Sequence, residues 1–385
     1  MQKHKRYIYT ISIILLSFVA IICCEKSNKR IGEVKIGLIA MLTGENAQNG
    51  RNMADGARLA VDRVNERGGL KLGKRTHRVV LIIEDERGSP DGAMDAARKL
   101  IFKEEVNAIV GPQFSSSAIP VAKLAEKEKV VMLAPMSTHP ETTAGKRYVF
   151  RIPYLDTFQG MVIGRFAREV LGAETAAVLY DVAGVYNRTL AEIFRETFER
   201  SGGVVNAFET YTTDQNQDFM EQLGRISSAA PHVLFLPNYS GDVLIQAHQA
   251  RKQGITAILL GGDGWDQVQV TQIGDFDGSY MTRHWDPGIY NDISIAFCKA
   301  YKKRYGRDPE DVAATTYDAI EMLCTAIEFA GKADAGTVQK ALYSVGTYRG
   351  VTGTISYTES GDPVKSAVIV GIKNGSASVH TIIEP

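Results

Sequence analysis

The sequence predicts an α/β protein with two lobes, each a doubly wound parallel sheet, joined by a hinge that the chain crosses three times. Two series of alternating strand and helix patterns predict the lobes, because such alternation produces parallel sheets covered by helices on both faces. The alternation is interrupted at residues 151–153, 285–287 and 346–353, which are the expected crossings. The expected first lobe is 32–152 with 286–347, and the expected second lobe is 153–285 with 348–385.

In the first series, short apolar or β-branched runs that end at turns predict the strands. These runs are residues 34–42, 79–84, 106–110 and 130–134. Between them, helical spacing of apolar residues predicts one helix along the stripe from Met53 to Val64, one opened by Ser89 and Pro90, and one opened by residues 115–117. The continuous apolar runs favour strands that are buried on both faces.

The second series repeats this architecture without a sequence repeat that can be aligned. Helices are expected over residues 157–170, 187–200, 219–227 and 241–252, and strands over 176–180, 204–211, 233–237 and 258–260. Two long helices are then expected at 292–305 and 312–330, followed by strands at 352–357, 367–373 and 378–383. Asn374 and Gly375 predict the tight turn of a β-hairpin.

The beginning of the chain predicts an export signal. Three basic residues precede an apolar run over residues 7–22, which is short for a membrane span of about 20 residues. We expect a signal peptide over 1–23 and a linker over 24–31, with Cys24 as the lipidated residue of a lipoprotein. The alternative is an uncleaved apolar anchor. Both predict a folded part that lies outside the cytoplasm and is tied to a membrane.

Composition argues against several classes of function. Without residues 1–23 the chain has 41 basic and 44 acidic residues, a net charge of −3, which predicts no nucleic-acid binding. Cys298 and Cys324 show no metal-site spacing and are expected to be free, although a disulfide between them stays possible if their Cα atoms lie within about 7 Å. Residues 68–75 have the spacing of a phosphate-binding loop but follow a helix, so we expect a helix C-cap and a hairpin there. No motif of a hydrolase occurs, so neither an enzyme nor a cofactor is expected.

Candidate ligand-binding residues follow the carboxyl ends of the expected strands, where open α/β sheets bind ligands. Ser115 begins a helix after the strand over 106–110, and its hydroxyl and the first N–H groups of the helix suit a carboxylate. The alternative is that the serines only cap this helix. His139 is expected to be a surface residue of such a loop. The other strand-end loops contribute hydroxyl groups on the first lobe, and aromatic rings with one acid on the second: Ser137, Thr138, Tyr186, Tyr239, Asp263 and Trp265.

Together these segments resemble the type I periplasmic binding proteins, specifically the leucine/isoleucine/valine-binding proteins of ABC transporters. Residues 55–62, 111–117 and 134–138 are the most similar to that family. The resemblance implies the fold described above, a cleft between the lobes, and a ligand with a carboxylate and an ammonium group.

The resemblance also implies roles for individual residues. Ser115 and Thr138 would hold the α-carboxylate of the ligand. The backbone carbonyl of Met136, the hydroxyl of Thr138 and the carboxylate of Asp263 would hold its ammonium group. Tyr186 and Tyr239 would close over the ligand from the second lobe.

Two departures from the family pattern affect the expected specificity. The acid is often a glutamate in the family, and Asn49 stands where the family has an aromatic residue. Specificity is therefore expected from a polar-to-aromatic pocket formed by Asn49, Gln113, Tyr186, Tyr239 and Trp265. The expected function is capture of an amino acid, hinge closure and delivery to an ABC transporter permease. The alternatives are a sensing receptor ectodomain and a binder of a carboxylic acid that lacks an amine.

Overall fold

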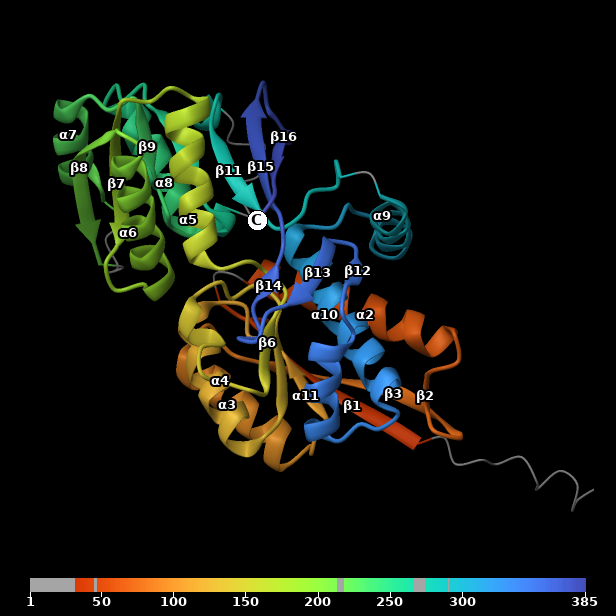
Figure 1. Cartoon of the computed structure of the whole chain (residues 1–385). Coiled ribbons are helices and arrows are strands. Elements are labelled where there is room, and N and C mark those ends of the chain that lie inside the picture. The colour runs from red at the N-terminus through yellow and green to blue at the C-terminus, as the bar shows by residue number, and fades with distance from the viewer. Residues whose placement is uncertain (1–31, 45–46, 213–217, 266–273, 290) are drawn as a thin grey trace, which may run out of the picture.

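The computed structural model describes residues 32–44, 47–212, 218–265, 274–289 and 291–385, which form two lobes (Figure 1). The first lobe contains a six-stranded sheet with the order β2-β3-β1-β4-β5-β6. Its strands are β1 (Gly32–Ala40), β2 (Leu70–Leu72), β3 (Arg75–Asp85), β4 (Ala108–Val110), β5 (Val131–Ala134) and β6 (Val149–Arg151). Neighbouring strands are parallel except β2, which pairs antiparallel with β3. This hairpin confirms the structure expected for residues 68–75.

Helices cover both faces of the first sheet, as the apolar runs predicted. Along β1, Ile36 and Leu38 pack in one core cluster, whereas Ile39 packs in another on the opposite face, because successive side chains of a strand alternate. The first cluster includes α2 and α10, and the second includes α3 and α4. The helices are α2 (Ala47–Glu66), α3 (Pro90–Phe102), α4 (Ser115–Glu128), α9 (Asp292–Tyr305), α10 (Asp311–Ala330) and α11 (Ala335–Ser344).

The second lobe contains a seven-stranded sheet with the order β16-β15-β11-β10-β9-β7-β8. Its strands are β7 (Thr175–Asp181), β8 (Val204–Tyr211), β9 (Val233–Phe235), β10 (Ile258–Gly261), β11 (Tyr280–Arg283), β15 (Ala367–Lys373) and β16 (Ser376–Ile383). Its helices are α5 (Asp156–Arg165), which continues as a π-helical turn over Phe166–Val170, α6 (Val185–Arg200), α7 (Met220–Ala229) and α8 (Ser240–Lys252). Asn374 and Gly375 have φ of 49° and 81° in the turn between β15 and β16, which confirms the predicted hairpin.

A small third sheet lies at the junction of the lobes (Figure 1). It consists of β12 (Tyr348–Gly350), β13 (Gly353–Tyr357) and β14 (Pro363–Val364). Val351 and Ile355 pack in the core of the first lobe, and the Tyr357 hydroxyl donates to the Arg151 carbonyl. Residues 348–364 therefore pack with the first lobe, whereas the sequence placed them in the second. The last passage between the lobes lies between β14 and β15.

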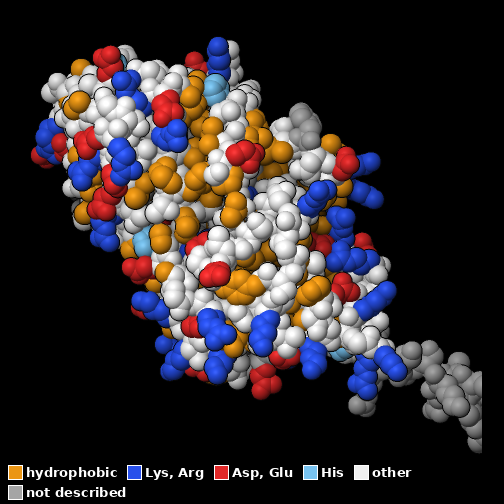
Figure 2. All heavy atoms as spheres, viewed as in Figure 1, with side chains coloured by type: hydrophobic (Ala, Val, Ile, Leu, Met, Phe, Trp, Pro, Cys, Tyr) orange, Lys and Arg blue, Asp and Glu red, His pale blue; other side chains and the backbone are white. Residues whose placement is uncertain are grey.

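Surface and cysteine features agree with the composition. Figure 2 shows charged side chains of both signs on both lobes of the face in view. Cys298 and Cys324 are free, as expected. Within the described ranges, no helix is long and apolar enough to cross a membrane, and no group of His, Cys, Asp and Glu is arranged to hold a metal ion. The predicted signal peptide and Cys24 lie outside the described residues.

Candidate functional site

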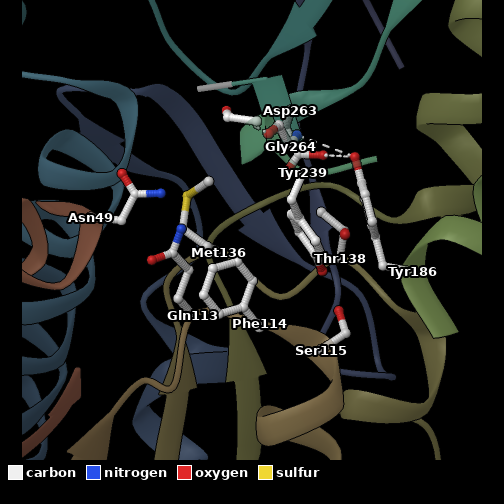
Figure 3. Close-up of a pocket in the computed structure, with 11 residues that line it drawn as sticks. Asn49, Gln113, Phe114, Ser115, Met136, Thr138, Tyr186, Tyr239, Asp263 and Gly264 are labelled. Atoms are coloured by element: carbon white, nitrogen blue, oxygen red, sulfur yellow. Dashed lines mark hydrogen bonds between the residues drawn. The ribbon is translucent and has the colours of Figure 1, made fainter. Parts of the chain in front are cut away.

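A pocket lies between the lobes, at the carboxyl ends of strands of both sheets (Figure 3). Polar and aromatic side chains from both lobes line it. The first lobe contributes Asn49, Gln113, Phe114, Ser115, Met136 and Thr138, and the second contributes Tyr186, Tyr239, Ser240, Asp263 and Gly264.

The wall from the first lobe is built on neutral donors at the start of α4. The N-cap residue is Phe114, and its side chain forms no capping hydrogen bond, so the alternative that the serines only cap the helix is wrong. Ser115 instead forms a hydroxyl chain, with its Oγ 3.0 Å from Ser137 Oγ, which lies 2.8 Å from Thr142 Oγ1. An uncapped helix start beside hydroxyl groups favours an anion, because the first N–H groups and the helix dipole act together.

A buried arginine supports the loop that presents Thr138. Arg151 donates from Nη1 to the Ser137 carbonyl at 3.0 Å and from Nη2 to the His139 carbonyl at 2.9 Å. Its Nε lies 2.8 Å from Asp362 Oδ1, and its side chain is fully buried. The two carbonyls flank Thr138, so the arginine orients this residue from behind the pocket wall. No motif in the sequence marked Arg151 for this role.

The wall from the second lobe carries a negative charge on Asp263. Its Oδ1 accepts hydrogen bonds from Gln159 Nε2 at 2.7 Å and from the Tyr186 hydroxyl at 3.0 Å. Its Oδ2 lies 3.2 Å from His284 Nε2. Burial alone would raise the pKa of Asp263, but the bond and the charge of His284, with the bonds from Gln159 and Tyr186, outweigh burial and lower this pKa. The pocket therefore faces an ionised carboxylate.

Aromatic and polar contacts join the two walls. The rings of Phe114 and Tyr239 meet edge to face, with centroids 4.9 Å apart, and Tyr239 stacks on Tyr186 at 5.2 Å. His139 Nε2 lies 3.1 Å from Thr189 Oγ1 of α6. His139 is buried, so the expectation that it is a surface residue is wrong. The structure thus brings the lobes together around the pocket.

The structure gathers eight of the predicted site residues at this one pocket and places two elsewhere. Those at the pocket are Asn49, Gln113, Ser115, Met136, Thr138, Tyr186, Tyr239 and Asp263. Ser137 lies behind Ser115 as its hydrogen-bond partner. Trp265 is a correction: its indole N–H donates to the Leu236 carbonyl at 2.9 Å and its ring packs on Phe276 in the core. A fully buried ring held in this way does not line the pocket.

Sequence reasoning missed several residues that form or support the site. Phe114, Ser240 and Gly264 line the pocket, and each is adjacent in sequence to a predicted residue, so extending each strand-end loop by one position would have found them. Gln159 and His284 contact Asp263 from α5 and from the end of β11. Because β11 was not predicted as a strand, its end was not recognised as part of the site.

Residues 33–377 match the family model described as periplasmic binding protein. The chain is 30% identical over 334 residues to the Leu/Ile/Val-binding protein BraC3 of Rhizobium johnstonii, a match that covers 86% of this chain and 89% of that protein.

Two solved structures show the same fold. The leucine binding protein LivK of Thermotoga maritima is 33% identical, with a TM-score of 0.84, and covers 91% of this chain and 99% of its own. The branched-chain amino acid transporter substrate binding protein LivJ of Streptococcus pneumoniae, solved with isoleucine, is 26% identical, with a TM-score of 0.83. That match covers 92% of this chain and 100% of the other.

Proposed function

Since the chain belongs to the type I periplasmic binding proteins, in the branch of the leucine/isoleucine/valine-binding proteins, we propose that it captures a free amino acid between its lobes and delivers it to an ABC transporter permease. Proteins of this family are extracytoplasmic substrate-binding proteins of transporters and not enzymes. The chemistry of the pocket supports a role in binding a small zwitterion.

The observation that carries this proposal is the division of charge across the pocket. One wall offers neutral donors, the Ser115 and Thr138 hydroxyl groups and the start of α4, and the other offers the ionised carboxylate of Asp263. A zwitterion that enters a closed cleft loses water at both ends, so each charge needs its own partner there. We assign the α-carboxylate to the first wall and the ammonium group to Asp263.

The side chain of the ligand is expected to face the amide groups of the pocket. Figure 3 shows Asn49, Gln113 and Met136 on the side of the pocket away from Tyr186. The Oε1 atom of Gln113 is buried, and no described residue gives it a hydrogen bond. A ligand with a hydrogen-bond donor near this atom would satisfy it. We therefore propose an amino acid whose side chain carries a hydrogen-bond donor.

A thermal-shift screen over the common amino acids, on protein unfolded and refolded to remove retained ligand, tests this proposal. A ligand that binds only the folded chain raises the apparent stability by about 2.7 kcal/mol at one hundred times its Kd. We expect an amino acid with a hydrogen-bond donor in its side chain to give the largest shift in melting temperature. If leucine, isoleucine and valine alone stabilise the protein, the proposed preference for a polar side chain is wrong. If no amino acid stabilises it, the proposed function is wrong.

We also propose that Cys24 carries lipid and anchors the mature chain outside the cytoplasm. The Cys24→Ala variant is then expected to be released from membranes by washing with salt and carbonate, whereas the parent protein stays bound. Retention of all the variant in the membrane fraction would indicate an uncleaved apolar anchor instead.

A further inference from the structure

His284 is a buried histidine in direct contact with the ligand-facing acid. Its side chain is fully buried, with Nε2 3.2 Å from Asp263 Oδ2. Its backbone N–H donates to Asp311 Oδ2 at 2.9 Å, and its ring lies 4.2 Å from the ring of Tyr154. Among the described residues, nothing forms a hydrogen bond with its Nδ1 atom. Among the residues that the structure describes, Asp263 is therefore the only hydrogen-bond partner of the His284 side chain.

This contact is possible in two protonation states of the imidazole. In the neutral state, Nε2–H donates to Asp263 and the pair has a net charge of −1. In the protonated state the imidazolium neutralises Asp263 and the pair has no net charge. Among the described residues, the titratable groups in contact with His284 are Asp263 and Tyr154, which contact its ring, and Asp311, which accepts from its backbone N–H. A further cation at Asp263 would therefore compete with the proton of the imidazolium for the same carboxylate.

We propose that His284 serves as an interchangeable counter-ion of Asp263, so that the pocket accepts two classes of small carboxylate. The first is the α-amino acid of the proposed function, on which this inference rests, bound while His284 is neutral. The second is the corresponding 2-oxo acid, which has the same side chain and carboxylate but no ammonium group, bound while His284 is protonated. In the second case the imidazolium takes the place of the missing ammonium group.

Charge repulsion makes the other two combinations of ligand class and His284 protonation state unfavourable. An ammonium group and an imidazolium together would place two cations on a single carboxylate. A 2-oxo acid with neutral His284 would add a second anion to a closed pocket whose acid has no cationic partner. Buried unpaired charges of this kind are costly because the low-dielectric interior screens them weakly.

The two ligand classes should therefore respond to pH in opposite directions. Where the free protein has a protonated His284, binding of the amino acid releases a proton, so its affinity falls as the pH falls, by at most about tenfold per pH unit. Where His284 is neutral, binding of the 2-oxo acid takes up a proton, so its affinity falls as the pH rises, with the same limit. Histidine is the side chain whose ordinary titration lies between pH 5 and 8.

Isothermal titration calorimetry between pH 5 and 8 tests the inference. The probes are the amino acid that gives the largest shift in the screen and its 2-oxo analogue; if this is serine, the pair is serine and 3-hydroxy-2-oxopropanoate. In His284→Gln, an amide that does not titrate can still donate to Asp263. We expect amino-acid binding to lose its pH dependence in this variant, and the 2-oxo acid to bind at least tenfold more weakly at pH 5.5.

His248→Gln is the matched control, because His248 Nδ1 also lies 3.1 Å from an acid, Asp275, but on the exposed surface away from the pocket. In this variant, the affinities for the amino acid and for the 2-oxo acid should keep their opposite dependence on pH. If His284→Gln does not fold, titration of the parent protein in two buffers of different ionisation enthalpy still measures the proton released or taken up. Three outcomes would each overturn the inference. The affinities for the two ligands could change with pH in the same direction, the 2-oxo acid could fail to bind at any pH, or a folded His284→Gln could keep the pH dependence of the parent protein. If no amino acid binds, the proposed function itself fails.

Discussion

The two walls of the pocket place their charges differently. In the first lobe the charge lies behind the wall: Arg151 is buried against Asp362 and two loop carbonyls, and the wall presents only neutral donors. In the second lobe the charge lies in the wall, because Asp263 itself faces the pocket. The first lobe thus uses charge to hold its shape and the second uses charge to hold its ligand. Removing a charge should therefore damage stability in one lobe and affinity in the other.

The largest expected effect is on stability. Arg151→Met would leave Asp362 without its partner, and the carbonyls of Ser137 and His139 would lose their buried donor. Removing one partner of a buried ion pair costs about 3 to 5 kcal/mol. We expect the free energy of unfolding, measured in urea without ligand, to fall by this amount.

Arg225→Met is the control for this substitution. Arg225 pairs with Glu209 and Glu221 on an exposed face of the second lobe, where solvent screens the charges. Its loss should leave the free energy of unfolding close to that of the parent protein. Equal losses in the two variants would show that Arg151 has no special structural role.

The second-largest effect is expected on the affinity for the amino acid. Asp263→Asn keeps the shape of the wall but leaves the ligand's ammonium group without a charged partner. Such a loss costs about 2 to 5 kcal/mol of binding free energy, or at least about 30-fold in Kd. Calorimetry with the amino acid from the screen measures it. Binding as tight as that of the parent protein would mean that no ammonium group lies at Asp263.

Much of this arrangement could be predicted from sequence because local patterns determine it. Alternating strands and helices place Ser115, Thr138 and Asp263 at strand ends, and strand ends of parallel sheets meet at the pocket. The remaining features depend on contacts between distant segments. Trp265 directly follows a pocket residue, yet its indole N–H turns it into the core, and His284 reaches Asp263 only because β11 joins the sheet beside β10. No spacing in the sequence carries that information.

The first lobe also contains a buried acid, Glu86, whose pKa is shifted in the opposite direction from that of Asp263. Glu86 lies beside the start of α4, where burial raises its pKa to about 7, while the Ser117 hydroxyl lowers it and Asp85 raises it further. Asp263 is also buried, yet its stronger donors lower its pKa. Glu86 is therefore protonated in the folded state at a pH where the unfolded chain has already lost the proton.

This difference predicts a loss of stability as the pH rises. The folded pKa of Glu86 lies above the unfolded one, so the protonated carboxyl stabilises the fold fully below about pH 4.5, and this contribution disappears as the pH rises toward 7. The maximum change is about 3 kcal/mol, at 1.36 kcal/mol per unit of pKa. Glu86→Gln should therefore gain stability relative to the parent protein between pH 4.5 and 7.5 in urea unfolding. The exposed Glu66→Gln is the control, and a similar gain there would contradict the assignment to Glu86.

The smallest effect is expected for Ser115→Ala, on the neutral wall. The hydroxyl of Ser115 is one of several donors there, because Thr138 and the start of α4 remain, and a single net hydrogen bond contributes about 0.5 to 1.5 kcal/mol. The expected loss of affinity is below about tenfold, which is less than for Asp263→Asn. Exposed Ser116→Ala, one residue further along the same helix, should leave the Kd unchanged. A loss for Ser115→Ala larger than that for Asp263→Asn would reverse the comparison, because the hydroxyl groups and not the carboxylate would then dominate binding.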